Sequence, residues 1–309
     1  MNTPTTNRVC QLARIDIPII QAPMTYIAGA QLASAVSNVG ALGIIETASE
    51  EGRLDLKRVR DLTDRPVGAN VALIMVRDPK IVEVLVDADI RFVTTSAGDP
   101  SLLTGLLHDA GITVFHVVGT LHAARKAVDA GVDGLIVEGV EGGGFKNRFG
   151  ASSMVLLPLV AEEFDLPIVA AGGICDSRSM AAAFVLGAEG VQMGTRLLAS
   201  MESPVHDNFK TAIVDSDETG TVLVPLAGSR VMRVIRTPAA ERSANPGDSG
   251  LQDVRQLYFE GRMDASVANT GQVAGRITAI RPVAEIITEM WESCQMELAE
   301  AAKRLGSHP

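Results

Sequence analysis

Short apolar segments alternate with segments of helical periodicity from Ile17 to about Val214. The apolar segments are rich in Val and Ile, show no polar alternation, and end at Gly, Pro or Asn. This composition is typical of parallel strands that are buried on both faces. The segments lie at 17–24, 41–46, 66–73, 90–98, 113–119, 134–140, 167–173 and 190–195. The pattern therefore predicts eight strands, each followed by a helix.

Glycines stand where several of the intervening helices should end. Gly40, Gly111, Gly131 and Gly187 each follow a run of helical periodicity, and glycine is favoured just past a helix because the chain there needs a positive φ. Units that repeat every 20–25 residues or so predict a closed (β/α)8 barrel. An open, doubly wound sheet shows the same alternation and is the alternative; eight regular units favour the barrel.

The alternation stops after Val214. A polar stretch punctuated by Pro and Gly follows, then an amphipathic helical pattern at 251–268, a Gly-marked turn at 270–277 and a final helix at about 281–305. We therefore predict a barrel over 1–214, a small lid domain inserted at 215–275, and a C-terminal helix within 276–309 that completes the barrel. This long helix is expected to pack either on the barrel or on a second subunit, as in a homodimer.

Composition and charge narrow the class of protein. The chain has 309 residues, of which 47% are hydrophobic, and a net charge of -10. It has no Lys/Arg run, no 18-residue apolar run and no apolar leader, so neither a nucleic-acid partner nor a membrane is expected. The three cysteines, Cys10, Cys175 and Cys294, are too far apart in sequence for a disulfide framework or a clustered metal site. A cytoplasmic enzyme with a small-molecule substrate is the expectation.

Glycines at the ends of strands seven and eight predict a phosphate site. The seventh strand ends in Ala-Ala-Gly172-Gly173, and the eighth ends in Met-Gly194-Thr195. In barrel enzymes the loops after these two strands commonly bind phosphate. Glycine lets backbone N–H groups approach phosphate oxygens closely, and Thr195 adds a hydroxyl donor. The alternative is that these glycines serve only tight turns and helix packing.

Several motifs together resemble the nitronate monooxygenase family, formerly called 2-nitropropane dioxygenases. That family includes FMN-dependent enoyl-ACP reductases and related NADH:quinone reductases. The resemblance covers most of the chain. It rests on IIQAPM (19–24), AVSNVGALGII (35–45), GANVAL (68–73), GVDGLIVEGVEGGG (131–144), PIVAAGGI (167–174), GAEGVQMGTRLL (187–198) and GQVAGRI (271–277).

The resemblance implies one FMN per chain, with NAD(P)H as the expected co-substrate. It places the backbone of Ala22, Pro23 and Met24 beside the isoalloxazine ring and Asn70 at the edge of that ring. Residues after strand six should approach the flavin, and the glycine motifs should hold its phosphate. The further cofactor residues implied in this way are Glu138, Gly143, Gly144, Gly172, Gly173, Gly194, Thr195, Gln272 and Gly275. Pro23 as a strand stop and Asn70 as a turn residue remain the structural alternatives.

One position departs from the family pattern. Members usually carry a histidine after the glycines of the strand-six loop, where this chain has Phe145. Phenylalanine transfers no proton, so the usual nitroalkane oxidation is put in doubt, whereas a nitronate anion needs no prior deprotonation. His116, near the end of strand five, and Lys146 are the candidate proton sources. Lys146 and Arg148 either bind an anionic tail, such as a CoA or ACP phosphopantetheine, or face solvent.

Three functions are compatible with these residues. The first is an FMN-dependent oxidoreductase that passes hydride from NAD(P)H to an activated acceptor, an enoyl thioester or a quinone; this step needs orientation rather than a histidine base. The second is a nitronate monooxygenase that uses O2. The third is a protein that keeps FMN or another phosphate ligand without redox turnover, as a lyase, an isomerase or a binding protein.

Overall fold

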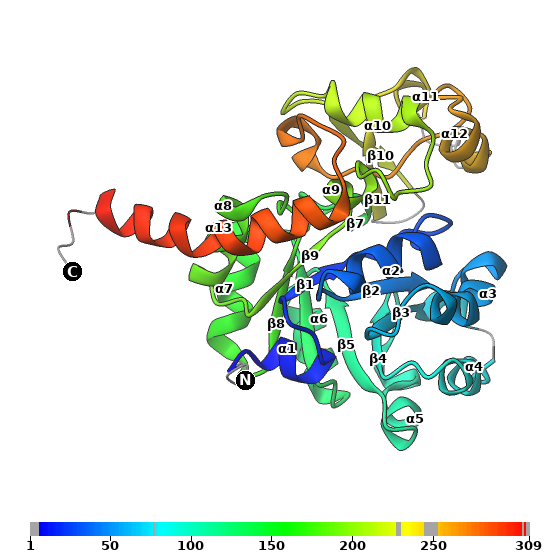
Figure 1. The fold of residues 1–309 in the computed structure, drawn as a ribbon, viewed down its shortest axis with the longest axis vertical. Coiled ribbons are helices and arrows are strands. Elements are labelled where there is room, and N and C mark those ends of the chain that lie inside the picture. The colour runs from blue at the N-terminus through cyan, green and yellow to red at the C-terminus, as the bar shows by residue number, and fades with distance from the viewer. Residues whose placement is uncertain (1–5, 77, 227–229, 244–252, 305, 307–309) are drawn as a thin grey trace.

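The computed structural model describes residues 6–76, 78–226, 230–243, 253–304 and 306. Figure 1 shows a barrel of strands ringed by helices, with a smaller unit of strands and helices above it. Parts of the predicted lid, at 227–229 and 244–252, lie outside the described residues, as do 1–5 and 307–309.

The barrel sheet consists of parallel strands. Its strands in the described chain are β1 (Ile19–Gln21), β2 (Gly43–Glu46), β3 (Val67–Ala72), β4 (Phe92–Ser96), β5 (Thr113–Val118), β6 (Gly134–Glu138), β8 (Ile168–Ala171) and β9 (Gly190–Met193). They run in the order β1-β9-β8-β6-β5-β4-β3-β2. The N–H groups of Gln21 and Leu42 donate across the β1–β2 seam at 2.9 Å each and close the ring. The predicted (β/α)8 barrel is confirmed, and each strand lies within its predicted range.

Helices surround this sheet. They are α2 (Ala30–Asn38), α3 (Glu50–Arg58), α4 (Ile81–Asp87), α5 (Thr104–Asp109), α6 (Leu121–Asp129), α7 (Ser153–Glu163), α8 (Ser177–Val185) and the short α9 (Thr195–Leu198). The four glycines predicted to end helices all have positive φ: +91° at Gly40, +69° at Gly111, +80° at Gly131 and +101° at Gly187. Those predictions are confirmed.

Side-chain alternation along the strands divides the buried residues into two clusters. Ile20, Ile44, Phe115 and Ile136 point into the barrel and form an apolar cluster with Val9 and other residues of α1 (Arg8–Ala13). The alternate residues, such as Val114 and Val118 of β5, belong to the larger cluster between the strands and the outer helices. The N-terminal end of the barrel is thus filled with apolar side chains and covered by α1.

The lid is built on an antiparallel sheet. Within the described chain this sheet has the order β10-β11-β7, with β10 at Thr221–Pro225, β11 at Arg230–Ile235 and β7 at Gly144–Asn147. Strand β7 belongs to the loop after β6, so the lid is not made by 215–275 alone, as predicted, but also takes residues from the barrel range. Around the sheet lie α10 (Asp207–Val214), α11 (Pro238–Arg242), α12 (Val254–Glu260) and the 3-10 helix η4 (Gln272–Arg276). The helix predicted at 251–268 is shorter than expected.

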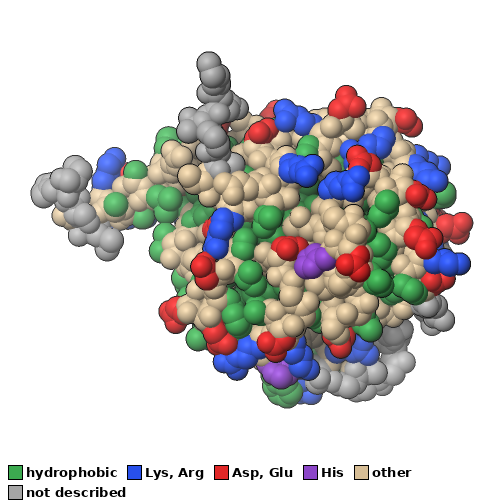
Figure 2. Space-filling view, turned by 90° about the horizontal axis from the view of Figure 1, so that it is seen from below, with side chains coloured by type: hydrophobic (Ala, Val, Ile, Leu, Met, Phe, Trp, Pro, Cys, Tyr) green, Lys and Arg blue, Asp and Glu red, His purple; other side chains and the backbone are tan. Residues whose placement is uncertain are grey.

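The final helix, α13 (Val283–Arg304), packs against α8 through buried residues that include Ile286, Met290 and Cys294. Figure 1 shows its C-terminal end projecting beyond the barrel, and the side chains from Leu298 to Arg304 are exposed. On the face seen in Figure 2, positive and negative side chains are interspersed. In the part of the chain that the structure describes, no helix has the length and apolar character needed to cross a membrane.

Candidate active site

The C-terminal ends of β1, β8 and β9 bring the predicted cofactor residues together at the barrel mouth. The Ala22 N–H donates to the Met193 carbonyl at 2.8 Å, so the segment after β1 lies beside the end of β9. A Cβ atom at Gly194 would lie 3.4 Å from the Ala22 Cβ and 3.8 Å from the Met24 sulfur. Ala22 and Met24 are therefore next to Gly194, and both are partly exposed, as is Pro23 between them.

Polar side chains replace apolar ones inside the barrel toward this mouth. Asn70 is buried, and its amide nitrogen donates to the Thr94 carbonyl at 3.0 Å and to the Thr94 hydroxyl at 2.9 Å. The side chain of Asn70 is thereby anchored to the neighbouring strand. It is held at the mouth with the N–H donors of its amide already used.

Gln192 is a polar residue of this layer that the sequence reasoning missed. Its side chain is 6% exposed, and its Oε1 atom is buried without a hydrogen-bond partner among the described residues. Gln192 lies opposite Ile20 and Ala171, whose side chains belong to the inward cluster. A buried amide oxygen without a partner is costly in a folded protein, so it marks a site for a ligand or water. The sequence did contain a signal for Gln192, because it is a polar residue at an inward position of the predicted strand 190–195.

The mouth glycines divide into two groups. A Cβ at Gly172 would lie 2.9 Å from the Gly142 nitrogen, and one at Gly143 would lie 2.9 Å from the Gly271 nitrogen. These two glycines allow backbone segments to pack against each other. By contrast, a Cβ at Gly173 would meet nothing closer than 3.9 Å, and one at Gly194 nothing closer than 3.4 Å. At Gly173 and Gly194 an added Cβ would make only ordinary contacts, so neither glycine serves to bring two backbone segments together, and the φ of +82° at Gly173 itself favours glycine.

Thr195 and Gln272 join the lid to the barrel. The Thr195 hydroxyl oxygen accepts a hydrogen bond of 2.8 Å from the Gly271 N–H, which leaves its own proton available to a further acceptor. The Gln272 N–H donates to the Glu141 carbonyl at 2.9 Å, so this motif closes onto the loop after β6. Gly275 is different: a Cβ there would collide with the backbone of Asp217. Its position is explained by packing at the start of the lid.

Glu138 and Lys146 form an ion pair at the mouth. Glu138 ends β6 on its inward face, and the Lys146 Nζ lies 2.8 Å from Glu138 Oε1. The same ammonium donates to the Gly143 carbonyl at 2.9 Å and to the Phe145 carbonyl at 3.1 Å. An ammonium has three donors, and all three are used here. Lys146 therefore holds the loop and Glu138 in place, and the prediction that it supplies a proton does not fit this geometry.

Phe145 lies on the opposite face of β7 from Lys146. Side-chain burial alternates along β7, with Lys146 buried and Phe145 54% exposed. Phe145 is paired with Met232 of the lid, whereas Lys146 reaches Glu138 at the barrel. Gly144, which precedes Phe145, has a φ of +78° and faces the Asn269 side chain. The ring that stands in the usual histidine position is directed toward the lid and solvent.

His116 lies outside the mouth, contrary to the proton-donor prediction. It alternates with the inward Phe115 along β5, so its side chain faces the helix layer together with Val114 and Val118. It is 4% exposed, and its Nδ1 lies 2.8 Å from the Thr95 hydroxyl. Burial lowers the pKa of His116 to about 4. The side chain is a hydrogen-bonded core histidine, separated from the site by its own strand.

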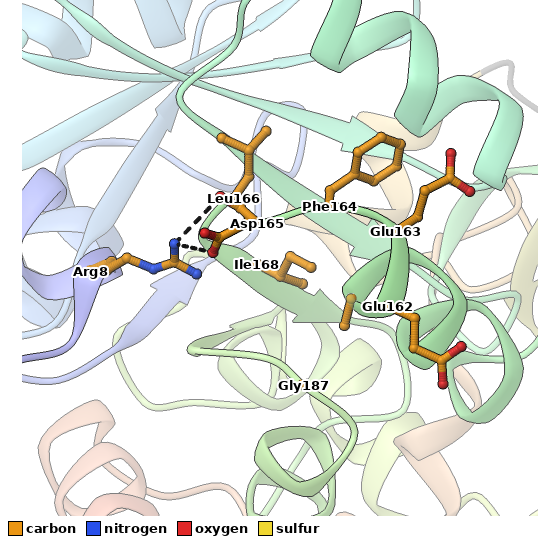
Figure 3. A pocket seen from close by; sticks show the side chains of 9 residues that line it. Arg8, Glu162, Glu163, Phe164, Asp165, Leu166, Ile168 and Gly187 are labelled. Atoms are coloured by element: carbon orange, nitrogen blue, oxygen red, sulfur yellow. Dashed lines mark hydrogen bonds and ion pairs between the residues drawn. The ribbon is translucent and has the colours of Figure 1, made fainter.

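The hollow drawn in Figure 3 belongs to the other end of the barrel. It has a volume of about 320 Å³ and is lined by Arg8, Asp165, Ile168 and other residues that precede or begin β8. Arg8 pairs there with Asp165 at 2.8 Å and with Glu189 at 2.6 Å. This hollow is therefore separate from the mouth. No group of three or more His, Cys, Asp or Glu side chains within the described ranges is placed to bind a metal ion.

Comparison with known proteins agrees with this architecture. The nitronate monooxygenase family profile matches residues 6–79 and 72–293. A Mycobacterium tuberculosis protein named (3aS,4S,5R,7aS)-5-hydroxy-7a-methyl-1-oxo-octahydro-1H-indene-4-carboxyl-CoA dehydrogenase is 34% identical, with 78% of this chain and 68% of that protein covered. A nitronate monooxygenase of Pseudomonas aeruginosa is 30% identical, with 82% and 86% covered.

A solved structure of FabK from Thermotoga maritima is similar throughout. It has a TM-score of 0.90 and 34% sequence identity, and the alignment covers 97% of this chain and 99% of that one. The family profile, the two sequence relatives and this structure agree with one another. This chain belongs to the nitronate monooxygenase family and is an oxidoreductase.

Proposed function

We propose that this enzyme binds FMN at the barrel mouth and uses NAD(P)H to reduce an activated acceptor, an enoyl thioester or a quinone. The observation that carries the proposal is the buried, unpaired Oε1 of Gln192, which lies on the inward face of β9 two residues before Gly194. That oxygen accepts hydrogen bonds, so it fits a ligand with N–H or O–H donors, such as a flavin ring or a ribityl chain.

The residues beside Gln192 fit the phosphate end of the same cofactor. Gly173 and Gly194 follow adjacent strands, and a Cβ at either position would make only ordinary contacts with nearby protein atoms. The Thr195 hydroxyl keeps a proton to donate after accepting from Gly271. Backbone amides and one hydroxyl at neighbouring strand ends are suited to phosphate oxygens. These three residues would hold the phosphate.

Bound FMN supplies the hydride relay between the nicotinamide and the acceptor. The protein contributes orientation: Asn70 is fixed to Thr94, and Glu138 is fixed by Lys146. Reduction of an enoyl thioester places hydride on the β carbon and a proton on the α carbon. Because the Lys146 ammonium has no unused donor and His116 faces the helix layer, solvent provides that proton.

A thioester acceptor has support among the relatives. The dehydrogenases of M. tuberculosis and Rhodococcus jostii, each 34% identical to this chain, are named for a carboxyl-CoA substrate. The loop that departs from the usual family pattern carries Phe145 in place of a histidine, and the exposed Arg148 lies three residues further on. Such a loop suits an organic anion better than it suits proton abstraction.

The purified protein tests the proposal directly. It should be isolated or reconstituted with FMN, and its visible flavin absorbance should bleach when NADH or NADPH is added anaerobically. An enoyl thioester or a quinone should then restore the absorbance. A colourless protein that takes up no FMN contradicts the cofactor assignment. A bound flavin that neither nucleotide reduces contradicts the reductase and favours a non-redox role.

Nitronate oxidation is a second candidate, because relatives at 30% and 26% identity are named nitronate monooxygenases. Phe145 cannot remove a proton from a neutral nitroalkane, whereas an alkyl nitronate is already deprotonated. Oxygen uptake with the nitronate but not with the nitroalkane would support this activity. If the Phe145→His variant gained turnover of nitroalkanes, the absence of a base at this position would be the reason that the unmodified enzyme does not oxidise them. Equal turnover of both substrates by the unmodified enzyme would contradict this account.

A further inference from the structure

The outer edge of the lid sheet carries an unusual group of side chains. Strand β7 has β11 as its neighbour on one side and no strand on the other in the described sheet. Its exposed face shows Phe145 and Asn147, and Asn147 is paired with Arg230 of β11. Arg148 and Phe149 follow in a turn. We call Phe145, Asn147, Arg148, Phe149 and Arg230 the β7 edge surface.

Two large rings on this surface are exposed to water. Phe145 is 54% exposed and Phe149 is 81% exposed. The turn that presents Phe149 is nonetheless held in place: the Phe149 N–H donates to Asn147 Oδ1 at 2.9 Å and the Gly150 N–H to the Asn147 carbonyl at 3.0 Å. An exposed ring on an anchored turn offers a stacking surface, and little backbone ordering remains to be lost on binding.

The two arginines of the surface are exposed and have no acidic partner. Within the described chain, neither the Arg148 nor the Arg230 guanidinium makes a hydrogen bond or ion pair. Most exposed arginines near carboxylates in this protein are paired, as Arg125 is with Glu163 and Arg281 is with Glu289. In a chain of net charge -10, two unpaired arginines beside two exposed rings favour a ligand that is both anionic and aromatic.

The β7 edge surface begins next to the barrel mouth and extends away from it. Gly143, just before β7, packs against Gly271, whose N–H is bonded to Thr195 at the mouth. From Gly144 to Asn147 an extended strand covers about 10 Å, before the turn and the side chains add their reach. The 13 bonds from sulfur to phosphorus in phosphopantetheine span about 15 Å when extended. The lengths match.

We infer that the β7 edge surface binds the coenzyme A part of an acyl-CoA. This inference rests on the proposed thioester acceptor. The pantetheine arm lies along the open edge of β7 past Phe145. The adenine ring stacks on Phe149, and the phosphates contact Arg148 and Arg230. Phe145 thus acquires a role in substrate binding at the position where a histidine is usual.

Calorimetric titration of coenzyme A into the holoenzyme tests the inference. The wild-type protein should bind it, and R148S/R230S should bind at least about tenfold more weakly, because charge-assisted contacts to phosphate are lost. F149S should also weaken binding, whereas F149Y retains the ring and should not. The matched control K303S/R304S removes two positive charges from the far end of α13 and should leave the affinity unchanged. Pantetheine, which lacks adenine and phosphate, should bind all variants alike.

Several results would overturn the inference. The inference would be wrong if the wild-type holoenzyme did not bind coenzyme A at millimolar concentration. It would also be wrong if R148S/R230S bound coenzyme A as tightly as the wild type, or if the α13 control K303S/R304S lost as much affinity as R148S/R230S. Binding of a phosphopantetheinylated carrier protein without binding of coenzyme A would also overturn it, since the surface would then recognise a protein.

Flavin reduction by NAD(P)H and its reoxidation by a quinone are measured separately on the same proteins. Failure of those reactions with coenzyme A binding intact would reject the proposed function alone. Normal redox turnover with a quinone and no coenzyme A binding would reject this inference alone.

Discussion

The two ends of the barrel use the same strands in opposite ways. At the N-terminal end, Val9 and Cys10 of α1 pack with Phe115 and other inward side chains into a closed apolar cluster. At the C-terminal end, the inward positions include the polar residues Asn70, Glu138 and Gln192. Burial of apolar surface at the closed end stabilises the fold, so the open end can keep polar groups and space for a ligand.

The largest effect is expected at the closed end. Phe115 is fully buried and contacts Phe92, with ring centroids 4.9 Å apart. Phe115→Ala should lower the free energy of unfolding by about 3–5 kcal/mol, because it removes a buried ring and leaves a cavity. Urea denaturation measures the loss. At low temperature, the FMN content of the folded fraction should not change; a loss of flavin affinity there would show that the two ends are not independent.

A substitution at His116 tests whether residues that face the outer helices affect stability without affecting the chemistry at the barrel mouth. The pKa of His116 is lowered from 6.5 to about 4 by burial. The unfolded chain therefore binds a proton that the folded chain does not, and the stability present above pH 6.5 is lost as the pH falls toward 4. The difference corresponds to about 3 kcal/mol. His116→Gln should flatten this part of the stability profile, as measured by urea denaturation at pH 5 and pH 7.5.

The same variant separates a core role from a catalytic one. Because His116 faces the helix layer, the flavin spectrum and the rate of flavin reduction by NAD(P)H should stay the same in His116→Gln. A reduced rate with an altered pH profile of turnover would place the histidine in the reaction and contradict the geometry.

A substitution at Gly194 should have the opposite outcome to one at Phe115: it should affect FMN binding and leave the stability of the fold nearly unchanged. The φ of Gly194 is -105°, which an alanine adopts readily, and an added Cβ would meet only Ala22 and Met24 at ordinary contact distance. Gly194→Ala should change the stability of the flavin-free protein by less than about 1 kcal/mol. It should weaken FMN binding by about tenfold or more, because the methyl group occupies the phosphate cradle. Fluorescence titration with FMN is the measurement, and unchanged affinity would argue that the phosphate lies elsewhere.

The smallest effect is expected at the joint between lid and barrel. Thr195→Val removes the hydroxyl that accepts from Gly271, and Thr195→Ser keeps it. The valine variant should lose about 1 kcal/mol of FMN binding free energy, roughly fivefold in affinity, and the serine variant should lose less. The ratio of the FMN dissociation constants of the two variants gives the contribution of the hydroxyl group to binding. A serine variant that loses as much affinity as the valine variant would contradict the role assigned to the hydroxyl.

Much of the barrel followed from local patterns. Val- and Ile-rich segments at regular spacing predicted the eight strands, and the glycines at 40, 111, 131 and 187 marked helix ends that the structure confirms. The lid was less predictable. Strand β7 lies in a Gly-rich loop without strand alternation, and it forms because β11 offers it an edge to pair with.

The same distinction applies to the site. The motifs predicted which strand ends meet, but the direction of a side chain depends on which face of its strand points into the barrel. His116 looked near the mouth in sequence and faces the helices instead, whereas Gln192 was overlooked and faces inward. For Lys146, only the positions of Glu138 and two carbonyl oxygens show that its donors are used.

The sequence by itself determined the order of strands and helices and the placement of flexible glycines, because strand burial and helix termination depend on local composition. The tertiary structure alone decided which mouth glycines let two backbone segments touch and which have only ordinary contacts around them. It also decided which polar groups are satisfied and which face of β7 meets solvent. These properties depend on contacts between segments far apart in the chain, which no local pattern encodes.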